Sequence, residues 1–284
     1  MSRVVGGSAA RRSGGVGYYA IASITAVLFL APTLATVVRS FQTSTAALEG
    51  WGGLAHLTLA NYAVLGRSGP GLLQYVQNSL ILSVGTALLS IVLSTLAGYA
   101  FARVRFAGRG VLFLFVLSPF LVPLTAIIAP VYAVASMLQL TNSLVGLILV
   151  YTVFQLPFSI FVMRNAFASI PVELEEASVL DGLGTLGMIR RTLWPLVLPG
   201  AATVGLYAFL AAWNEFLAAL IMLNSESNYT LPIALLNIQS GVFGTIDIGA
   251  LSAGATIATI PCFVLFLLLQ RYYVRGLTAG AVKL

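Results

Sequence analysis

Long uncharged apolar runs constrain the fold of this sequence more than any other feature. Residues 110–163 carry no charged side chain, and further uncharged runs occupy much of the remaining chain. A helix crosses the roughly 30 Å hydrocarbon core of a bilayer with about 20 residues. The 284 residues are 59% hydrophobic with a mean hydropathy of +1.00, more apolar surface than a water-facing domain could bury. We therefore predict an all-α, polytopic membrane protein.

The sequence predicts six transmembrane helices. The uncharged run 110–163 is too long for one span, and its polar segment 139–143 favours a turn that divides it. We expect a transmembrane region over residues 18–274, with an N-terminal tail at 1–17, a C-terminal tail at 275–284 and one large loop at 164–196. Within that region, the predicted spans are 18–38, 76–102, 111–137, 144–163, 197–222 and 248–270.

The basic residues predict the orientation of these spans, because Lys and Arg near span ends are retained on the cytoplasmic side. An even number of spans places both termini on one side. If that side is the cytoplasm, twelve basic residues lie inside and only Arg39 and Arg67 lie outside. We therefore expect a multi-pass protein of the cell membrane with both termini cytoplasmic. The net charge of +6 then reflects topology, and no nucleic-acid partner is needed to explain it.

Several kinds of chemistry are excluded by composition. Lys283 is the only lysine, so the chain has no P-loop, and one His with one Cys cannot form a His/Cys metal cluster. The segment 182–187 reads GLGTLG, but no preceding strand and no ribose-binding acid accompany it, so it does not indicate a dinucleotide site. We predict no catalytic residue, no metal site and no cofactor on this chain, which is therefore not expected to be an enzyme.

The stretch 173–200 gathers four of the chain's eight acidic residues. Pro171 favours the start of a helix, and three glutamates fall in its first two turns, where carboxylates interact well with the helix dipole. Gly182 permits a sharp bend, after which a second short helix leads to Pro195. This bent helix pair suits docking onto another protein. The alternative is an ordinary loop whose charges only keep it solvated.

The same stretch resembles the cytoplasmic "EAA" loop of permease subunits of ATP-binding-cassette importers, whose pattern is E-A-A, three residues, G, nine residues, I-x-L-P. Ser178, Thr192 and Trp194 depart from it. Further stretches resemble the carbohydrate-uptake branch of these permeases, which includes the second permease subunit of maltose transporters. They are HLTLANYAVL, NSL at 78–80, WNEF at 213–216, YTLPIAL from Tyr229 and QRYYVRGLTAGAVK from Gln270. The matching positions of the loop are Glu176-Ala177-Ser178, Asp181-Gly182 and Thr192-Leu193-Trp194-Pro195.

The resemblance implies a type I importer fold in which this loop is the coupling helix, seated on an ATPase subunit. It also implies four kinds of partner: a second homologous permease, an ATPase dimer that binds ATP and Mg²⁺, an extracytoplasmic solute-binding protein and the lipid bilayer. The transported solute would be a sugar, with a glycerol phosphate compound as the alternative. The residues implied for ATPase coupling are Glu176, Ala177, Asp181, Gly182, Arg190 and Pro195, and for contact of the tail with the ATPase dimer Gly276, Ala279, Gly280 and Lys283.

A second candidate site is Trp213-Asn214-Glu215 in the fifth predicted span. A carboxylate within a span marks by default a pathway or a polar partner. An indole face can stack on a sugar ring while Asn and Glu bond its hydroxyls, which predicts a substrate pathway. The structural alternative is that Glu215 only holds two helices together.

Two other functions compete with the importer subunit. A self-sufficient ion-coupled carrier would use Glu215 as its proton or sodium site. A membrane scaffold would transport nothing. The carrier gives no purpose to the charged loop at 173–200, and the scaffold would show no ligand-stimulated ATP hydrolysis when assembled with partners.

Overall fold

The computed structural model describes residues 16–43, 57–67, 70–241 and 247–281, and these are helical and connecting segments without a β-strand. The helices of the described chain are α1 (Val16–Ser40), α3 (Ala60–Arg67), α4 (Leu72–Arg103), α5 (Arg109–Leu117), η2 (Ser118–Leu121), α6 (Leu124–Met137), α7 (Leu144–Ala168), α8 (Glu173–Leu180), α9 (Thr185–Met188), η3 (Ile189–Leu193), α10 (Trp194–Asn214), α11 (Leu217–Met222), η4 (Glu226–Asn228), α12 (Leu231–Gln239) and α13 (Ile248–Ala281).

Five described helices are long and apolar enough to cross a membrane: residues 17–40, 72–103, 144–168, 185–214 and 248–268. The count rises to six if the bent pair 109–121 and 124–137 forms one span. The helical fold and the number of spans thus agree with the sequence-based expectation.

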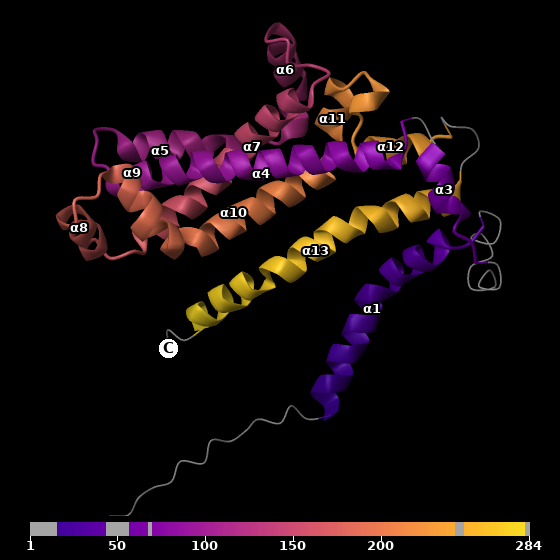
Figure 1. The fold of residues 1–284 in the computed structure, drawn as a ribbon, viewed down its shortest axis with the longest axis horizontal. Coiled ribbons are helices and arrows are strands. Elements are labelled where there is room, and N and C mark those ends of the chain that lie inside the picture. Colours follow the sequence, from indigo (N-terminus) through magenta and orange to yellow (C-terminus); the bar gives the residue numbers. More distant parts are fainter. Residues whose placement is uncertain (1–15, 44–56, 68–69, 242–246, 282–284) are drawn as a thin grey trace, which may run out of the picture.

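The expected single span over residues 111–137 is broken in the structure. Its two halves meet at an angle of 105°, and α6 points across the long axis of the bundle in Figure 1 while it contacts α7 and α11. Pro123 explains the break, because proline has no backbone N–H to donate and disfavours helical geometry in the residue before it. Val122 is accordingly extended, with φ −100° and ψ 115°.

The expected span 197–222 is also interrupted. Helix α10 ends at Asn214, Glu215 is extended with ψ 136°, and α11 begins at Leu217. The side chain of Glu215 and the backbone of α11 meet at this break, so the interruption is part of a candidate site.

Helix α4 is the central helix of the bundle, and it packs along α7 and α10. Its buried face carries small polar residues such as Ser83, Thr86 and Ser90, which allow neighbouring backbones to approach closely. At Gly98 a Cβ atom would lie 2.7 Å from the Cβ of Met163 on α7. Only glycine therefore fits there without a shift of α7.

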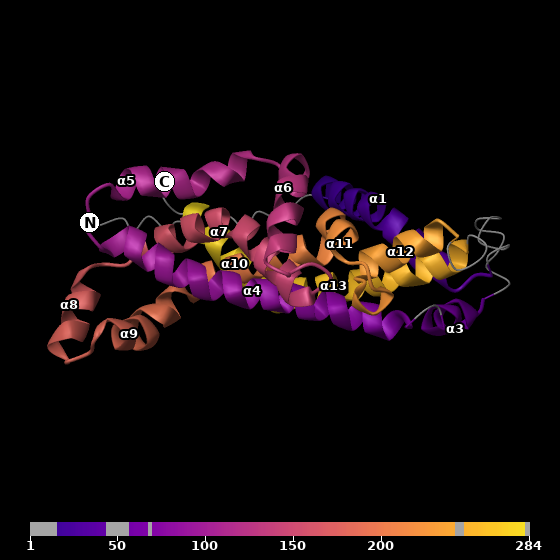
Figure 2. The same ribbon diagram turned by 90° about the horizontal axis from the view of Figure 1, so that it is seen from above.

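The two ends of the bundle differ. In both ribbon views α8 and α9 project at one end, whereas α3 and α12 lie at the other end (Figures 1 and 2). Helix α1 packs against α13, and its apolar stretch is otherwise uncovered by the protein. A helix that exposes apolar side chains all round suits contact with lipid.

Candidate functional site

The charged stretch forms a bent pair of short helices, which we call the elbow and define as residues 171–195. Its first limb is α8, which carries three acidic residues in its first turn, where they face the positive end of the helix dipole. The limb ends at Asp181. Gly182 follows with φ +78°, a left-handed conformation that glycine adopts without steric cost. The chain then turns back through α9.

The second limb of the elbow is anchored in the core. Met188, Ile189 and Leu193 are buried against Met163 and Phe167 of α7. The stretch 189–193 forms a π-helical turn that leads into α10. The second limb therefore connects α10 directly to the bundle, while the first limb stands outside it.

All six residues predicted to couple to an ATPase are exposed on the elbow. Pro195 lies in the first turn of α10. Two leucines of the elbow, Leu180 and Leu186, are 88% and 74% exposed. Apolar side chains displayed beside carboxylates suit a groove on a partner protein. The exposed residues among the predicted set are Glu176, Ala177, Asp181, Gly182, Arg190 and Pro195.

One contact of the elbow was missed by sequence reasoning. The Arg103 guanidinium at the end of α4 has its Nε 2.5 Å from Oε1 of Glu175, and its Nη2 donates to the carbonyl oxygen of Ile170. The two side chains are only 14% and 12% exposed. Because 72 residues separate the partners, no local spacing in the sequence indicates this ion pair.

Ser178 and Thr192, which both depart from the loop pattern, form a hydrogen bond with each other. The hydroxyl oxygens of Ser178 on α8 and Thr192 on η3 are 2.8 Å apart, and the Ser178 hydroxyl also lies 2.8 Å from the carbonyl oxygen of Leu174. Ser178 is buried. The joint departure at these positions was the available signal for this contact.

In the predicted trio Trp213-Asn214-Glu215, the first two residues line one cavity and Glu215 has other partners. The indole N–H of Trp213 donates to the carbonyl oxygen of Ala258 on α13 at 3.0 Å, and its ring stacks on Phe209. Trp213 is only 3% exposed. The Asn214 amide donates to the carbonyl of Leu210 within α10. Trp213 and Asn214 line a cavity of about 380 Å³, whose other lining residues include Phe216, Pro232 and Gln239.

Glu215 lies toward other partners. Its carboxylate accepts hydrogen bonds from the hydroxyl of Tyr151 on α7 and from the backbone N–H of Ala218 at 3.0 Å. The second bond caps the first turn of α11. Glu215 thus joins α7 to the break between α10 and α11.

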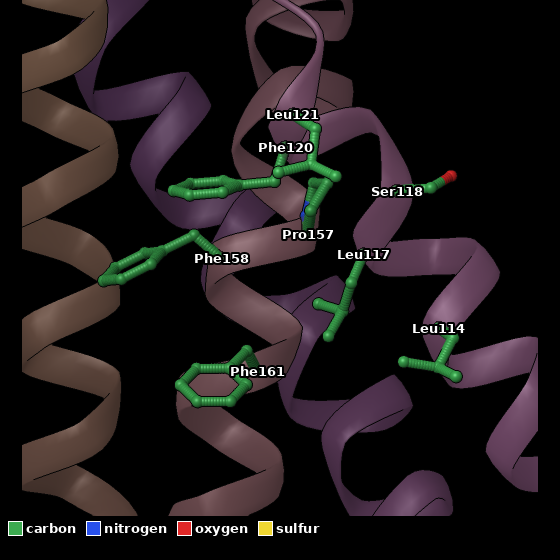
Figure 3. A pocket seen from close by; sticks show the side chains of 8 residues that line it. All are labelled: Leu114, Leu117, Ser118, Phe120, Leu121, Pro157, Phe158 and Phe161. Atoms are coloured by element: carbon green, nitrogen blue, oxygen red, sulfur yellow. The ribbon is translucent and has the colours of Figure 1, made fainter.

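A larger cavity, of about 530 Å³, opens between α5–η2 and α7. Figure 3 shows its aromatic and aliphatic side chains, with Ser118 as the polar lining residue. Such a lining offers few hydrogen bonds to a hydroxylated solute. The lining residues are Leu114, Leu117, Ser118, Phe120, Leu121, Pro157, Phe158 and Phe161.

Comparison with known proteins decides what kind of protein carries this site. Residues 90–279 match the family described as "Binding-protein-dependent transport system inner membrane component". The chain belongs to this family. The match covers the elbow and α10, so the bent helix pair lies inside the family's shared region.

Named relatives extend the family match. The permease is 38% identical over 210 residues to the diacetylchitobiose uptake system permease protein of Streptomyces coelicolor, covering 74% of this chain and 75% of the relative. It is 33% identical over 209 residues to the trehalose/maltose transport system permease protein of Thermococcus litoralis, covering 74% and 75%. The fold matches a bacterial ABC transporter involved in alginate import with a TM-score of 0.78 at 20% identity, covering 95% and 100%.

These matches fix the class of the protein. The permease is a membrane-embedded transport subunit and not an enzyme. The ion-coupled carrier considered from the sequence is not favoured.

The C-terminal tail is the remaining predicted contact region. Gly276, Ala279 and Gly280 fall within the last turns of α13. Lys283 lies outside the described residues. The role of these four residues stays a prediction.

Proposed function

We propose that this permease translocates a carbohydrate across the cytoplasmic membrane by alternating access, driven by partner ATPase subunits. The observation that carries the proposal is the elbow. Its second limb packs Met188, Ile189 and Leu193 into the bundle, whereas its first limb exposes carboxylates and Leu180. A partner protein that binds the first limb can therefore move the membrane helices through the second limb.

The proposal places the elbow and both termini in the cytoplasm. Its support is the one-sided distribution of Lys and Arg, because these residues are retained inside. The end of the bundle that carries α3 and α12 then faces outward (Figure 1).

Four kinds of partner complete the proposed importer. A second permease subunit shares the membrane region with this one and the lipid bilayer, and an extracytoplasmic solute-binding protein delivers the sugar. Two ATPase subunits bind ATP and Mg²⁺, so this chain needs no cofactor of its own. The family description itself contains the words "binding-protein-dependent".

Coupling is assigned to the exposed side of the elbow. Glu176 would face basic groups of the ATPase while Gly182 provides the bend, and Asp181 and Arg190 would add supporting contacts. Ala177 and Pro195 would fit the elbow into the ATPase cleft, and the tail residues 276–283 would reach the ATPase dimer. Closure of the ATPases would then switch the spans from inward-open to outward-open. A switch from 1:99 to 99:1 requires about 5.5 kcal/mol of differential interaction.

The proposed solute is a neutral oligosaccharide. The relatives named above handle diacetylchitobiose and trehalose or maltose. The cavity beside Trp213 and Asn214 combines aromatic and amide side chains, which suit sugar rings and hydroxyls. Because Glu215 is engaged by Tyr151 and Ala218, we assign it a structural role beside that pathway.

The test is reconstitution of the complete complex, isolated through a tag on this chain, in liposomes with its binding protein. We expect diacetylchitobiose, trehalose or maltose to stimulate ATP hydrolysis and to be taken up. Glycerol 3-phosphate serves as the contrasting solute. Stimulation by glycerol 3-phosphate alone would refute the carbohydrate assignment, and transport by this chain without ATPase subunits would refute the proposed mechanism.

A further inference from the structure

Helix α4 connects the elbow to the opposite end of the bundle. Its 32 residues correspond to a length of about 48 Å at 1.5 Å per residue. It is also the one helix among the five described spans whose sequence contains no proline. Proline is one main cause of sharp helix kinks, and α4 runs as one uninterrupted α-helix from Leu72 to Arg103, so it is suited to move as one rigid body. Internal prolines occur in the other four at Pro32, Pro157, Pro199 and Pro261.

Polar contacts hold the elbow end of α4. Arg103 is the last residue of the helix, and its guanidinium binds the Glu175 carboxylate and the Ile170 carbonyl. Ile170 lies directly before the elbow, and Glu175 lies within its first limb. Both elements are therefore attached to one side chain of α4. Arginine suits this arrangement because its planar fork presents several fixed donors.

Polar contacts also hold the other end of α4. The Asn78 amide donates to the carbonyl oxygens of Ser227 and Tyr229 at 2.8 and 2.9 Å. The Ser79 hydroxyl accepts the backbone N–H of Leu231 at 2.8 Å, and the Tyr75 hydroxyl bonds Glu226 at 3.1 Å. These three α4 side chains are buried. The segment 226–231 therefore follows the position of this end of α4.

From these contacts we infer that α4 is a rigid strut between the elbow and segment 226–231, and that Arg103 and Glu175 are the positioning residues that engage it. The inference rests on the proposed ATP-driven function. It separates two roles within one limb: exposed Glu176 for contact with the ATPase, and shielded Glu175 for transmission into the bundle.

A cysteine reporter at the outer end tests the strut. Cys262 is the chain's only cysteine, so Cys262→Ser with Ser227→Cys places a single thiol beside the Asn78 contact, at an exposed position. In the liposome-reconstituted complex, a membrane-impermeant maleimide reports the state of segment 226–231. The parent in this test is the complex that carries Cys262→Ser and Ser227→Cys. Trapping it with ATP and vanadate should change the labelling rate of the thiol about fivefold or more, which is the lower end of the coupling factors typical between two sites.

Variants of the ion pair decide the outcome. Arg103→Gln and Glu175→Gln should each reduce the change to less than about twofold, below that range, while the ATPase still co-purifies. Arg103→Lys keeps the positive charge and should retain more of the response than Arg103→Gln. Arg105→Gln, at an exposed position two residues along, should behave as the parent.

Two results would overturn the inference. One is a full labelling response in both Arg103→Gln and Glu175→Gln, and the other is loss of the ATPase from either complex, which would make the pair a docking contact. If Arg103→Gln is not recovered from membranes, Glu175→Gln and Arg103→Lys decide between these readings. A parent complex without any ATPase or nucleotide response would instead refute the proposed function itself.

Discussion

The hydroxyl oxygens of Ser178 and Thr192 lie 2.8 Å apart and join the two limbs of the elbow. Ser178 stands on α8 and Thr192 on the π-helical turn η3, so the hydrogen bond closes the bend formed at Gly182. The loop pattern that this chain resembles has Ala and Ile at these two positions. One polar pair here takes the place of one apolar pair.

This exchange predicts a non-additive pair of substitutions. Ser178→Ala alone should destabilise the permease by about 1 kcal/mol, because the Thr192 hydroxyl loses its partner in a partly buried site. Ser178→Ala combined with Thr192→Ile should recover most of that loss, since an apolar pair leaves no unpaired group. Thermal unfolding in detergent of the parent, Ser178→Ala, Thr192→Ile and the double variant measures the coupling between the two substitutions. Strictly additive changes would show that the hydrogen bond contributes nothing.

Glu176→Lys is predicted to abolish association with the ATPase while the membrane region stays folded. Glu176 is exposed on α8, so its replacement removes no internal contact, but it reverses a charge offered to the partner. Glu173→Lys, also exposed in the same turn, is the matched control and should have the smaller effect. Co-purification of the ATPase measures the result. Recovery of the ATPase at the parent level with Glu176→Lys contradicts the assignment.

Tyr151→Phe is predicted to destabilise the permease by about 1–3 kcal/mol, because the hydrogen bond from the buried Tyr151 to the Glu215 carboxylate is lost. Tyr207→Phe is the control, since that ring is 39% exposed and packs on Phe158. Thermal unfolding and sugar uptake should be compared for both. A selective loss of uptake by Tyr151→Phe, with unchanged stability, would instead place Glu215 on the substrate path.

Gly98→Val should separate α4 from α7. The new side chain would begin 2.7 Å from the Cβ of Met163 and 2.9 Å from the backbone nitrogen of Arg164, and overpacking of this kind costs about 1–3 kcal/mol. Gly110→Val is the control, because a Cβ there meets nothing within 4 Å. Reduced yield and a lower unfolding temperature for Gly98→Val alone are the expected results. Equal behaviour of the two variants would argue against tight α4–α7 packing.

The sequence sufficed for features that depend on local pattern. Apolar run length predicted a helical membrane protein, and Pro171 and Gly182 predicted the start and bend of the elbow. These features follow from hydrophobicity and backbone preference within a few residues. The 105° bend within the third predicted span was not predicted from the sequence. Its cause is nevertheless local, because the break lies directly before Pro123.

The remaining features depend on partners distant in the chain. Arg103 pairs with Glu175 and Tyr151 with Glu215, and no sequence period links either pair. The sequence predicts one substrate pathway at residues 213–215 from the chemistry of its side chains. In the structure Trp213 and Asn214 line one cavity, whereas Glu215 bonds to Tyr151 on α7, a partner that the sequence does not indicate.

The contact between α1 and α13 pairs the first long helix of the chain with the last. A ribosome releases α1 into the translocon long before α13 has been synthesised. During that interval the apolar stretch of α1 lacks its α13 partner, and Ser40 at its end is held by hydrogen bonds to Asn61 and Tyr62 of α3. Closure of the bundle on this side must therefore be among the latest steps of biogenesis, and a chain stalled before residue 248 would leave α1 attached at this one end.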